Sequence, residues 1–392
     1  MEEWKEYKLG DVSTFSQGIQ VDIDKQYSDY KPGRVRFIRI VDFTKNGEPQ
    51  RYIDKPRDKY LTADGDIVMI RYGSQTAGIV AKSYDGAIAN NIFKIEFNND
   101  VISNEFGYYY LSQKSIFDYL RGAQSSSTMP AITFEIAGRV PLCLPTINIQ
   151  NDIVSILKSL DDKIEVNRRI NDNLEQQAQA LFKSWFVDFE PFKDGEFVES
   201  ELGMIPKGWR VGTLFDVAEI LDKYRKPLSG KDRESMKKLY PYYGATSCMD
   251  YVDNYIFDGI YTLIGEDGSV AKEDGLPYMQ YVWGKLWVNN HAHILQGKNG
   301  FSTEMIHVFL SMTNIQHLVT GAVQAKLSQA NMQKILLPIP PSEVLDNIRP
   351  IIDKQYELKR NKEEESRRLA TLRDTLLPKL MSGELKVNDI KE

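Results

Sequence analysis

The chain has 392 residues, of which 42% are hydrophobic and 27% are charged, and its formal net charge is -6. One hydrophobic core rarely spans this length, so we expect two or three domains of an ordinary soluble globular protein. No apolar run reaches the ~18–20 residues of a membrane helix, and the charged N-terminus lacks an apolar signal segment. We therefore expect a cytoplasmic protein that makes no membrane contact. Cys143 and Cys248 lie far apart, which excludes a disulfide framework and a cysteine-based zinc site.

Basic residues are concentrated in two stretches of this acidic chain. Residues 24–60 hold ten Lys/Arg against six Asp/Glu, and residues 222–240 hold seven against three. Affinity for phosphate follows the local field at a surface more than the total charge. The stretches are compatible with DNA binding, although such a stretch alone is more often a solvated face.

Several local motifs recur in the same order at an offset near 200 residues, which indicates an internal duplication. The recurring motifs are Trp4-Lys5 with Trp209-Arg210, Leu9-x-Asp11-Val12 with Leu214-x-Asp216-Val217, Asp64-Gly65 with Asp258-Gly259, Gly73-Ser74 with Gly268-Ser269, Asn90-Asn91 with Asn289-Asn290, Gly122-Ala123 with Gly321-Ala322, Leu144-Pro145 with Ile339-Pro340, and Leu174 and Leu181 with Leu369 and Leu376. Each match is weak, but the conserved order is not expected by chance.

Residues 1–149 form the first predicted domain, and its apolar segments read as short strands. These segments are RVRFIRIV, DIVMIRY and NIFKIEF, and they are rich in Ile, Val, Tyr and Phe. Asp-Gly pairs in both halves of the chain predict tight turns; the pairs are Asp64-Gly65, Asp85-Gly86, Asp258-Gly259 and Asp267-Gly268.

Residues 150–190 are predicted to form the first long helix. Its apolar residues alternate at spacings of four and three, which is a heptad seam; the seam residues are Ile153, Leu157, Leu160, Ile164, Leu174 and Leu181. Asn167 and Asn171 also fall on this seam, where polar residues can fix register at a cost in stability. The alternative is that they face solvent. Aromatic residues end the helix, and 191–207 reads as a linker.

Residues 208–342 form the second predicted domain, in which YTLIG and WVNNHAHIL read as strands, and residues 343–392 form the second long helix with a C-terminal tail. The seam of this helix is partly apolar, at Ile348, Ile352, Leu369 and Leu376, and charged residues crowd its middle. Neither helix can bury its stripe alone, so we expect the two to pack on each other.

The predicted fold is therefore of the α+β class. Two similar β-rich domains are separated by two long helices that pair as an antiparallel coiled coil, with pseudo-two-fold symmetry. About 30 residues of helix at ~1.5 Å each would hold the domains about 45 Å apart, which is about 13 base pairs of B-DNA.

Motifs for catalysis or metal binding are weak. His291 and His293 would share one face of a strand, but no second ligand cluster is evident, so we predict no metal site. Asp258, Glu266 and Asp267 lack the lysine of a metal-dependent nuclease motif. The sequence also contains neither a phosphate-binding P-loop nor an Asn/Asp-Pro-Pro-Tyr/Phe methyltransferase motif. Together these absences favour a binding role.

The chain resembles the specificity subunit of type I restriction–modification systems over nearly its whole length. The resemblance rests on the duplicated order and on local motifs, namely ALFKSWFVDFEP followed by LGMIPKGW, then KPLSGKDR, YPYYGA, IFDGIYTLIGEDGSV, VWGKLWVNNHAH and RRLATLRDTLLPKLMSGEL. It implies two target-recognition domains that each read one half of a bipartite double-stranded DNA sequence. It also implies helices that set the spacer and dock two methyltransferase subunits.

The same resemblance implies a non-catalytic chain with no cofactor of its own. S-adenosylmethionine would belong to the partner adenine methyltransferase, and ATP and magnesium to two motor-nuclease subunits that would complete the restriction complex. A different hypothesis is a two-domain scaffold that binds proteins, because the net charge is acidic and the second helix is highly charged.

Residue types that read bases or grip phosphates give the candidate DNA contacts. In the first domain these are Arg34, Arg36, Arg39, Arg71, Tyr72, Ser74, Gln75, Gln124, Ser125, Ser126 and Thr128. In the second domain these are Lys223, Arg225, Lys226, Lys231, Arg233, Tyr242, Tyr243, Lys326 and Gln329. The paired asparagines are ambiguous, because residues shared by two domains that read different sequences are more often scaffold.

Overall fold

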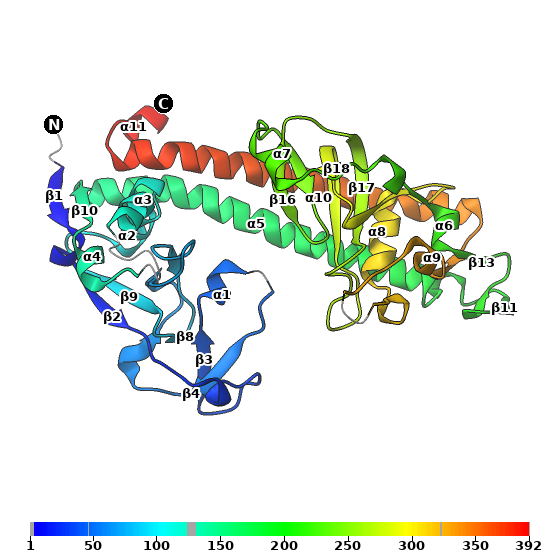
Figure 1. Ribbon diagram of the computed structural model, residues 1–392, viewed down its shortest axis with the longest axis horizontal. Helices are drawn as coiled ribbons and strands as arrows, with labels where there is room; N and C mark the ends of the chain where they lie inside the picture. The colour runs from blue at the N-terminus through cyan, green and yellow to red at the C-terminus, as the bar shows by residue number, and fades with distance from the viewer. Residues whose placement is uncertain (1–3, 46, 124–130, 322–323, 392) are drawn as a thin grey trace. The chain divides into compact units, whose positions relative to one another are not determined.

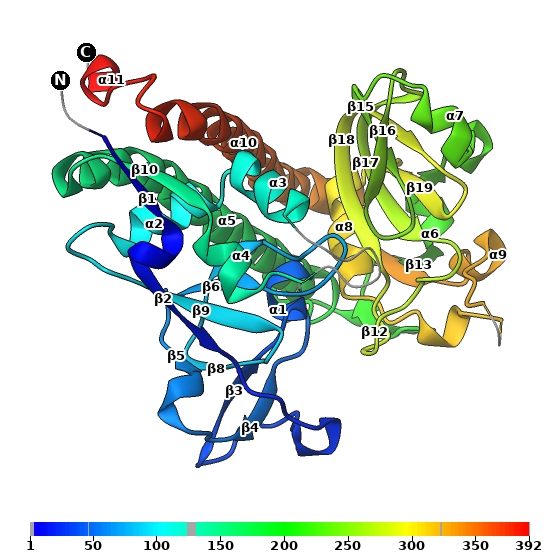
Figure 2. The same ribbon diagram turned by 60° about the vertical axis from the view of Figure 1, so that its left-hand side comes forward.

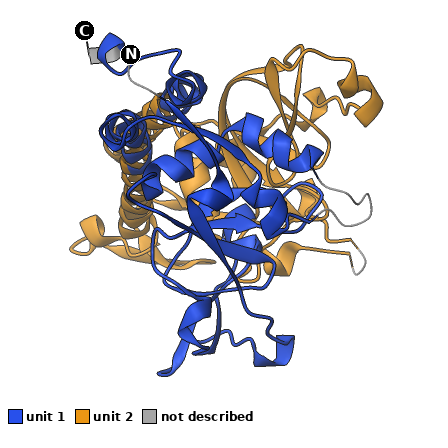
Figure 3. Cartoon of the chain, turned by 90° about the vertical axis from the view of Figure 1, so that its left-hand side faces the viewer, with its two compact units in different colours: residues 1–165, 366–392 blue, residues 166–365 orange. Residues whose placement is uncertain are grey.

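The chain folds into two compact units that each contain part of two long helices. The computed structural model describes residues 4–45, 47–123, 131–321 and 324–391. Unit 1 comprises residues 1–165 and 366–392, and unit 2 comprises residues 166–365 (Figures 1 and 3). The helices are α5 (Ile147–Phe186) and α10 (Ser342–Met381). The α+β fold with two β-rich bodies and two long helices is as predicted.

Unit 1 contains two four-stranded sheets and a separate strand pair. The first sheet has the order β2 (Ser13–Gln17), β9 (Ile92–Phe97), β6 (Ile67–Ile70), β7 (Val80–Lys82), and the second has the order β4 (Arg51–Asp54), β3 (Arg34–Ile38), β8 (Gly86–Ile88), β5 (Leu61–Thr62). The strand pair joins β1 (Lys5–Lys8) to β10 (Pro141–Leu144). The helices around them are α1 (Val41–Thr44), α2 (Asn104–Leu111), α3 (Lys114–Gly122), α4 (Phe134–Gly138) and, near the C-terminus, α11 (Asn388–Lys391). Figure 2 shows β2, β9 and β6 beside one another.

Unit 2 is built on one six-stranded sheet and two separate strand pairs. The sheet has the order β14 (Ala218–Ile220), β19 (Ala292–Gly297), β17 (Phe257–Gly265), β18 (Met279–Val288), β15 (Tyr240–Tyr243), β16 (Cys248–Val252). The pairs are β13 (Arg210–Thr213) with β20 (Leu336–Ile339) and β11 (Phe197–Ser200) with β12 (Gly203–Pro206). The short helices are α6 (Leu214–Val217), α7 (Gly230–Glu234), α8 (Thr303–Ser311) and α9 (Gln329–Met332).

The duplicated motifs occupy equivalent places in the two units. Asp11 accepts a hydrogen bond from the backbone of Lys8 at 3.1 Å, and Asp216 accepts one from the backbone of Thr213 at 2.7 Å. Ser103 caps α2 through the N–H of Phe106, as Ser302 caps α8 through the N–H of Met305. A capping hydroxyl satisfies a backbone donor that the helix leaves open, so these repeated residues maintain the scaffold.

The long helices contact each other in antiparallel sense within each unit. In unit 1, Arg373 of α10 donates to Asp161 of α5 at 2.5 Å. In unit 2, Lys359 donates to Glu175 at 2.8 Å, and Asn167 donates to Glu365 at 3.1 Å. The residue numbers of these contacts increase along α5 while those of their partners decrease along α10, so the two helices run in opposite directions. Whether the side chains interlock as in a coiled coil stays a prediction.

Among the predicted seam residues, four are fully buried and the others are half-buried. Ile153 and Leu157 lie in the core of unit 1, and Ile348 and Ile352 lie in that of unit 2. The half-buried seam residues are Leu160, Ile164, Leu174, Leu181, Leu369 and Leu376. Asn167 and Asn171 are buried, so the alternative in which they face solvent is wrong.

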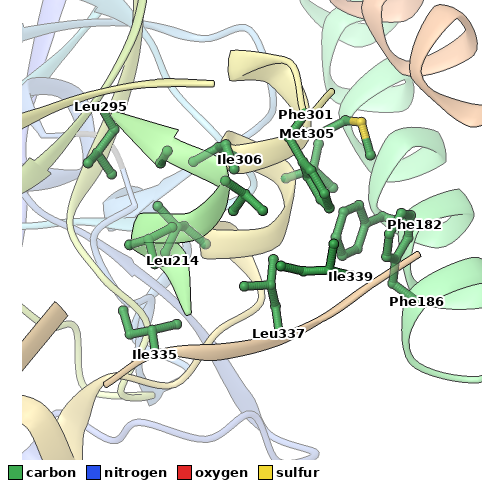
Figure 4. Packing of buried hydrophobic residues seen from close by; sticks show 14 of the residues in the cluster. Phe182, Phe186, Leu214, Leu295, Phe301, Met305, Ile306, Ile335, Leu337 and Ile339 are labelled. Carbon is green, nitrogen blue, oxygen red and sulfur yellow. The ribbon is translucent and has the colours of Figure 1, made fainter. Parts of the chain in front are cut away.

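The largest cluster of buried residues in unit 2 joins α5 to the β-rich body. Phe182 and Phe186 stack at 4.3 Å between ring centroids and face Phe301, Met305 and Ile339 (Figure 4). This packing buries the aromatic end of the helix, which stabilises the joint through apolar burial.

Three local predictions need correction. Asp258-Gly259 is not a turn, because both residues pair with Lys285 and Gly284 inside the β17–β18 ladder. WVNNHAHIL is not one strand, because β18 ends at Val288 and β19 begins at Ala292, which puts His291 in the connecting turn. The segment predicted as a linker contains the β11–β12 hairpin.

Among the described helices, none combines the length and apolar character that a membrane crossing requires.

Candidate nucleic-acid interface

Three of the predicted arginines of unit 1 are held by carboxylates. Arg34 pairs with Asp29 at 3.0 Å, and its guanidinium lies 3.4 Å from the centre of the Tyr27 ring. Arg36 and Arg39 pair with the enclosed carboxylate of Asp42 at 3.3 and 3.2 Å. These contacts order β3 and α1, and breaking a buried pair would leave an uncompensated charge.

Arg39 makes further contacts, with Glu48 at 3.6 Å and the carbonyl oxygen of Pro49 at 2.8 Å. Its side chain therefore has little freedom to turn toward a ligand. The three arginines lie on one segment that their ion pairs stabilise, and their contact with DNA stays a prediction.

Arg71 differs from these arginines, because no described residue gives its guanidinium a carboxylate partner. Its Nε is enclosed and makes no hydrogen bond within the described residues, while the Tyr72 ring lies 5.1 Å away. Ser74 and Gln75 follow on an exposed loop that Gly73 opens with a positive φ of 120°. Arg71, Tyr72, Ser74 and Gln75 thus form one candidate surface at the end of β6. The other predicted contacts, Gln124, Ser125, Ser126 and Thr128, lie outside the described residues.

The predicted contacts of unit 2 divide into exposed and enclosed side chains. The exposed ones are four lysines and a glutamine, namely Lys223, Lys226, Lys231, Lys326 and Gln329. Arg233 pairs with Asp250 at 2.8 Å. Tyr242 is a core residue whose hydroxyl accepts from the backbone of Leu228 at 3.0 Å, and Tyr243 is half-buried.

A polar network that the sequence did not predict lies at the ends of β17 and β19. His293 is buried and its Nδ1 lies 2.5 Å from Asp222, while its Nε2 lies 2.7 Å from the carbonyl oxygen of Leu327. Each ring nitrogen therefore faces an oxygen atom, one of a carboxylate and one of a backbone carbonyl. Burial acts to raise the pKa of Asp222, but the hydrogen bond and charge of His293 outweigh it and hold that pKa below its usual range.

Arg225 completes this network. Its guanidinium lies 2.7 Å from Glu266 and 3.3 Å from Asp222. Lys326 lies 3.6 Å from Glu266, and Gln329 donates to Asp222 at 2.7 Å. The predicted contacts Arg225 and Gln329 therefore serve at least in part to order this region.

Asp222, Glu266 and His293 are also the one group in the described chain that is close enough to hold a metal ion. A cation would have to displace Arg225 and Gln329, which already contact these carboxylates. We interpret the group as a hydrogen-bonded network. His291, the other member of the H-x-H motif, contacts Asp267 at 2.5 Å and does not join it.

Arg71 and Glu266 occupy the same backbone position in the two units. The N–H of Arg71 donates to Asn91 at 2.8 Å and its carbonyl accepts from Ile132 at 2.9 Å. The N–H of Glu266 donates to His291 at 2.9 Å and its carbonyl accepts from Leu327 at 2.8 Å. The scaffold is shared, but the side chains have opposite charge. The Gly73-Ser74 and Gly268-Ser269 match was the sequence signal for this equivalence.

Comparison with known proteins places this architecture in a family. The model of the type I restriction modification DNA specificity domain matches residues 1–176 and 206–366. The chain belongs to the type I restriction–modification DNA specificity family. It is 27% identical over 337 residues to the MjaIX specificity subunit of Methanocaldococcus jannaschii, covering 80% of this chain and 76% of the relative.

Two further similarities cover almost the full length of this member of the specificity family. The HindI specificity subunit of Haemophilus influenzae is 26% identical over 468 residues, covering 98% of this chain and 100% of the relative. The crystal structure of an S subunit from M. genitalium superposes with a TM-score of 0.53 at 17% identity and covers 96% of each chain. At that identity the superposition supports the fold.

Proposed function

We propose that the chain is the subunit that selects DNA sequence in a type I restriction–modification complex. Each unit reads one half of a bipartite double-stranded target, and the two long helices set the spacer and dock two methyltransferase subunits. The chain performs no catalytic step in this proposal. The partners supply the chemistry, with S-adenosylmethionine in the methyltransferase and ATP with magnesium in a motor-nuclease.

The observation that carries this proposal is that the two units share a backbone scaffold but place side chains of different chemistry on it. Asp11 and Asp216 make the same backbone contact, and so do the capping residues Ser103 and Ser302. At one equivalent backbone position, however, unit 1 has Arg71 and unit 2 has Glu266. Two domains that read different bases need this combination, because base edges are distinguished by donors and acceptors.

The helices support the spacer role through their length and their contacts. Each has 40 residues, so each is about 60 Å long at ~1.5 Å per residue. Antiparallel contacts such as Asp161 with Arg373 in unit 1 and Glu175 with Lys359 in unit 2 link the two helices.

The docking role is supported by apolar side chains that α10 leaves exposed. Ile351, Leu358 and Leu372 are 48%, 40% and 46% exposed. They are spaced by seven and fourteen residues, so they follow one face of the helix. Exposed apolar residues in a row are typical of a partner surface.

The test is to map methylated adenines in cells that express the chain with an adenine methyltransferase of this system. We expect a split asymmetric motif, with methylation lost when the chain is omitted. An unsplit palindrome would count against two independent units. A salt titration of the assembled complex separates the DNA-binding role from a protein scaffold, since phosphate contacts make log affinity fall with log salt.

A further inference from the structure

We propose that Arg71 reads a guanine in the half-site bound by unit 1. This inference rests on the proposed function and deepens it, because it assigns a base to one side chain. Arginine binds guanine through two parallel hydrogen bonds to O6 and N7, which requires a guanidinium whose terminal nitrogens are accessible and whose stem is held in place.

The terminal nitrogens of Arg71 meet the first requirement. No described residue offers them a carboxylate or hydrogen-bond acceptor, and Nε is the one side-chain nitrogen of Arg71 that is both enclosed and without a partner in the described chain. Arg34, Arg36 and Arg39 carry the same group but have carboxylates at 3.0 to 3.3 Å. Arg71 is thus the arginine of this predicted set that retains its capacity for an external acceptor.

The backbone of Arg71 meets the second requirement. Its N–H and its carbonyl are both hydrogen-bonded, to Asn91 at 2.8 Å and Ile132 at 2.9 Å, at the end of the buried strand β6. The neighbouring Tyr72 bridges to Ala131. A side chain that starts from a fixed backbone and has an enclosed stem loses less conformational entropy when it binds.

Unit 2 has a different residue at this position, so the arginine–guanine contact is expected in one half-site only. Glu266 stands at the equivalent backbone position, and Arg225 and Lys326 neutralise it at 2.7 and 3.6 Å. A carboxylate cannot donate to the O6 and N7 acceptors of guanine. The guanine preference is therefore expected in one half of the motif and not at the related place in the other half.

The experiment compares Arg71→Ala with Arg57→Ala in the complex of full-length chain and methyltransferase, using motif mapping and affinity for target DNA. Arg57 is exposed and also belongs to unit 1, so its substitution removes the same charge. We expect Arg71→Ala to lower discrimination at one guanine by on the order of tenfold to hundredfold, with the other half unchanged. Arg57→Ala should retain the full motif.

Arg71→Lys serves if Arg71→Ala does not fold, and the midpoint of thermal unfolding checks this. Lysine keeps the charge but lacks the planar fork, so we expect guanine preference to weaken while the salt dependence of binding stays the same. The proposal is overturned if the motif is unchanged in Arg71→Ala, if a base other than guanine is relaxed, or if binding weakens uniformly as for a phosphate contact. An unsplit motif in the unmodified chain would instead defeat the proposed function.

Discussion

His307 is enclosed within unit 2, where the rings of Tyr281 and Tyr356 lie 5.3 and 5.8 Å from its own ring. Burial and the nearby Lys359 ammonium lower the pKa of His307 to about 3, against an opposing effect of Glu175. Its Nδ1 lies 3.3 Å from the hydroxyl of Thr262. The folded protein therefore keeps this imidazole neutral at every pH at which it works.

This burial predicts a loss of stability in mild acid. Unfolded His307 has a pKa near 6.5, so below that pH the unfolded chain binds a proton that the folded chain excludes. The stability is present above pH 6.5 and falls as the pH drops toward 3, by about 1.4 kcal/mol at pH 5.5. His307→Gln should lose less unfolding free energy than the unmodified chain between pH 7.5 and 5.5 in denaturant titrations.

The matched control is His317→Gln, since His317 is exposed. Its pH profile should follow that of the unmodified chain. Equal slopes in His307→Gln and His317→Gln would show that the buried imidazole does not control this loss.

The sequence could identify which residue types read DNA but not which of them were already engaged. Arg34, Arg36, Arg39 and Arg71 are alike in type and lie within one domain. Arg34 pairs with Asp29, and Arg36 and Arg39 pair with Asp42, whereas Arg71 has no such carboxylate among the described residues; residue type alone does not show which arginine will be paired. The network around His293 was missed for a different reason, because Asp222, Glu266 and Gln329 are far apart in sequence.

At the scale of elements, α5 has a buried polar residue in its seam that lacks full hydrogen bonding. Asn171 is buried, and its Oδ1 has no hydrogen-bond partner within the described residues. An enclosed acceptor without a donor costs about 1–3 kcal/mol.

Asn171→Leu should therefore raise the unfolding free energy by about 1–3 kcal/mol, because it removes the unsatisfied acceptor and adds apolar burial. Chemical denaturation measures the change. Asn173→Leu on the exposed face should have little effect. A less stable or aggregated Asn171→Leu chain would mean that this asparagine fixes the helix register.

The exposed face of α10 predicts a second effect at this scale. The double substitution of Ile351 and Leu358 to Glu should weaken co-purification of the methyltransferase by at least tenfold, since it places charge in an apolar contact. Leu239→Glu is the control, because Leu239 is 60% exposed but lies outside the helix. Undiminished assembly of the double variant would remove α10 from the docking surface.

Helices were predictable and some strands were not, for physical reasons. A heptad pattern that extends over tens of residues is clear even where single positions depart from it, so both long helices were predicted close to their bounds. The observed α5 spans 147–186 and the prediction was 150–190; the observed α10 spans 342–381 and its predicted start was 343. The β11–β12 hairpin was missed because its stability depends on packing of Ile205 into the unit 2 core and not on a long apolar pattern.

At the scale of the whole molecule, the helix lengths should determine the DNA spacer. Removing residues 162–168 from α5 and 366–372 from α10 deletes one heptad from each and leaves the contacts of Asp161 with Arg373 and of Glu175 with Lys359 in place. The pair shortens by about 10 Å, about three base pairs, so we expect motif mapping to give a shorter spacer between unchanged half-sites.

Deletion from α5 alone is the control, because it mismatches the two helices and should abolish methylation. A spacer of unchanged length in the double deletion would contradict the ruler hypothesis.

Both β-rich bodies are closed at their base by their own first and last strands. β1 pairs with β10 immediately before α5 begins, and β13 pairs with β20 immediately before α10 begins. The first and last strands of each body thus lie side by side where a long helix begins. Recombination between related genes at these two borders would therefore replace one complete body and leave the long helices unchanged. Under the proposed function, such an exchange would change the DNA target and keep the surface that binds the partner subunits.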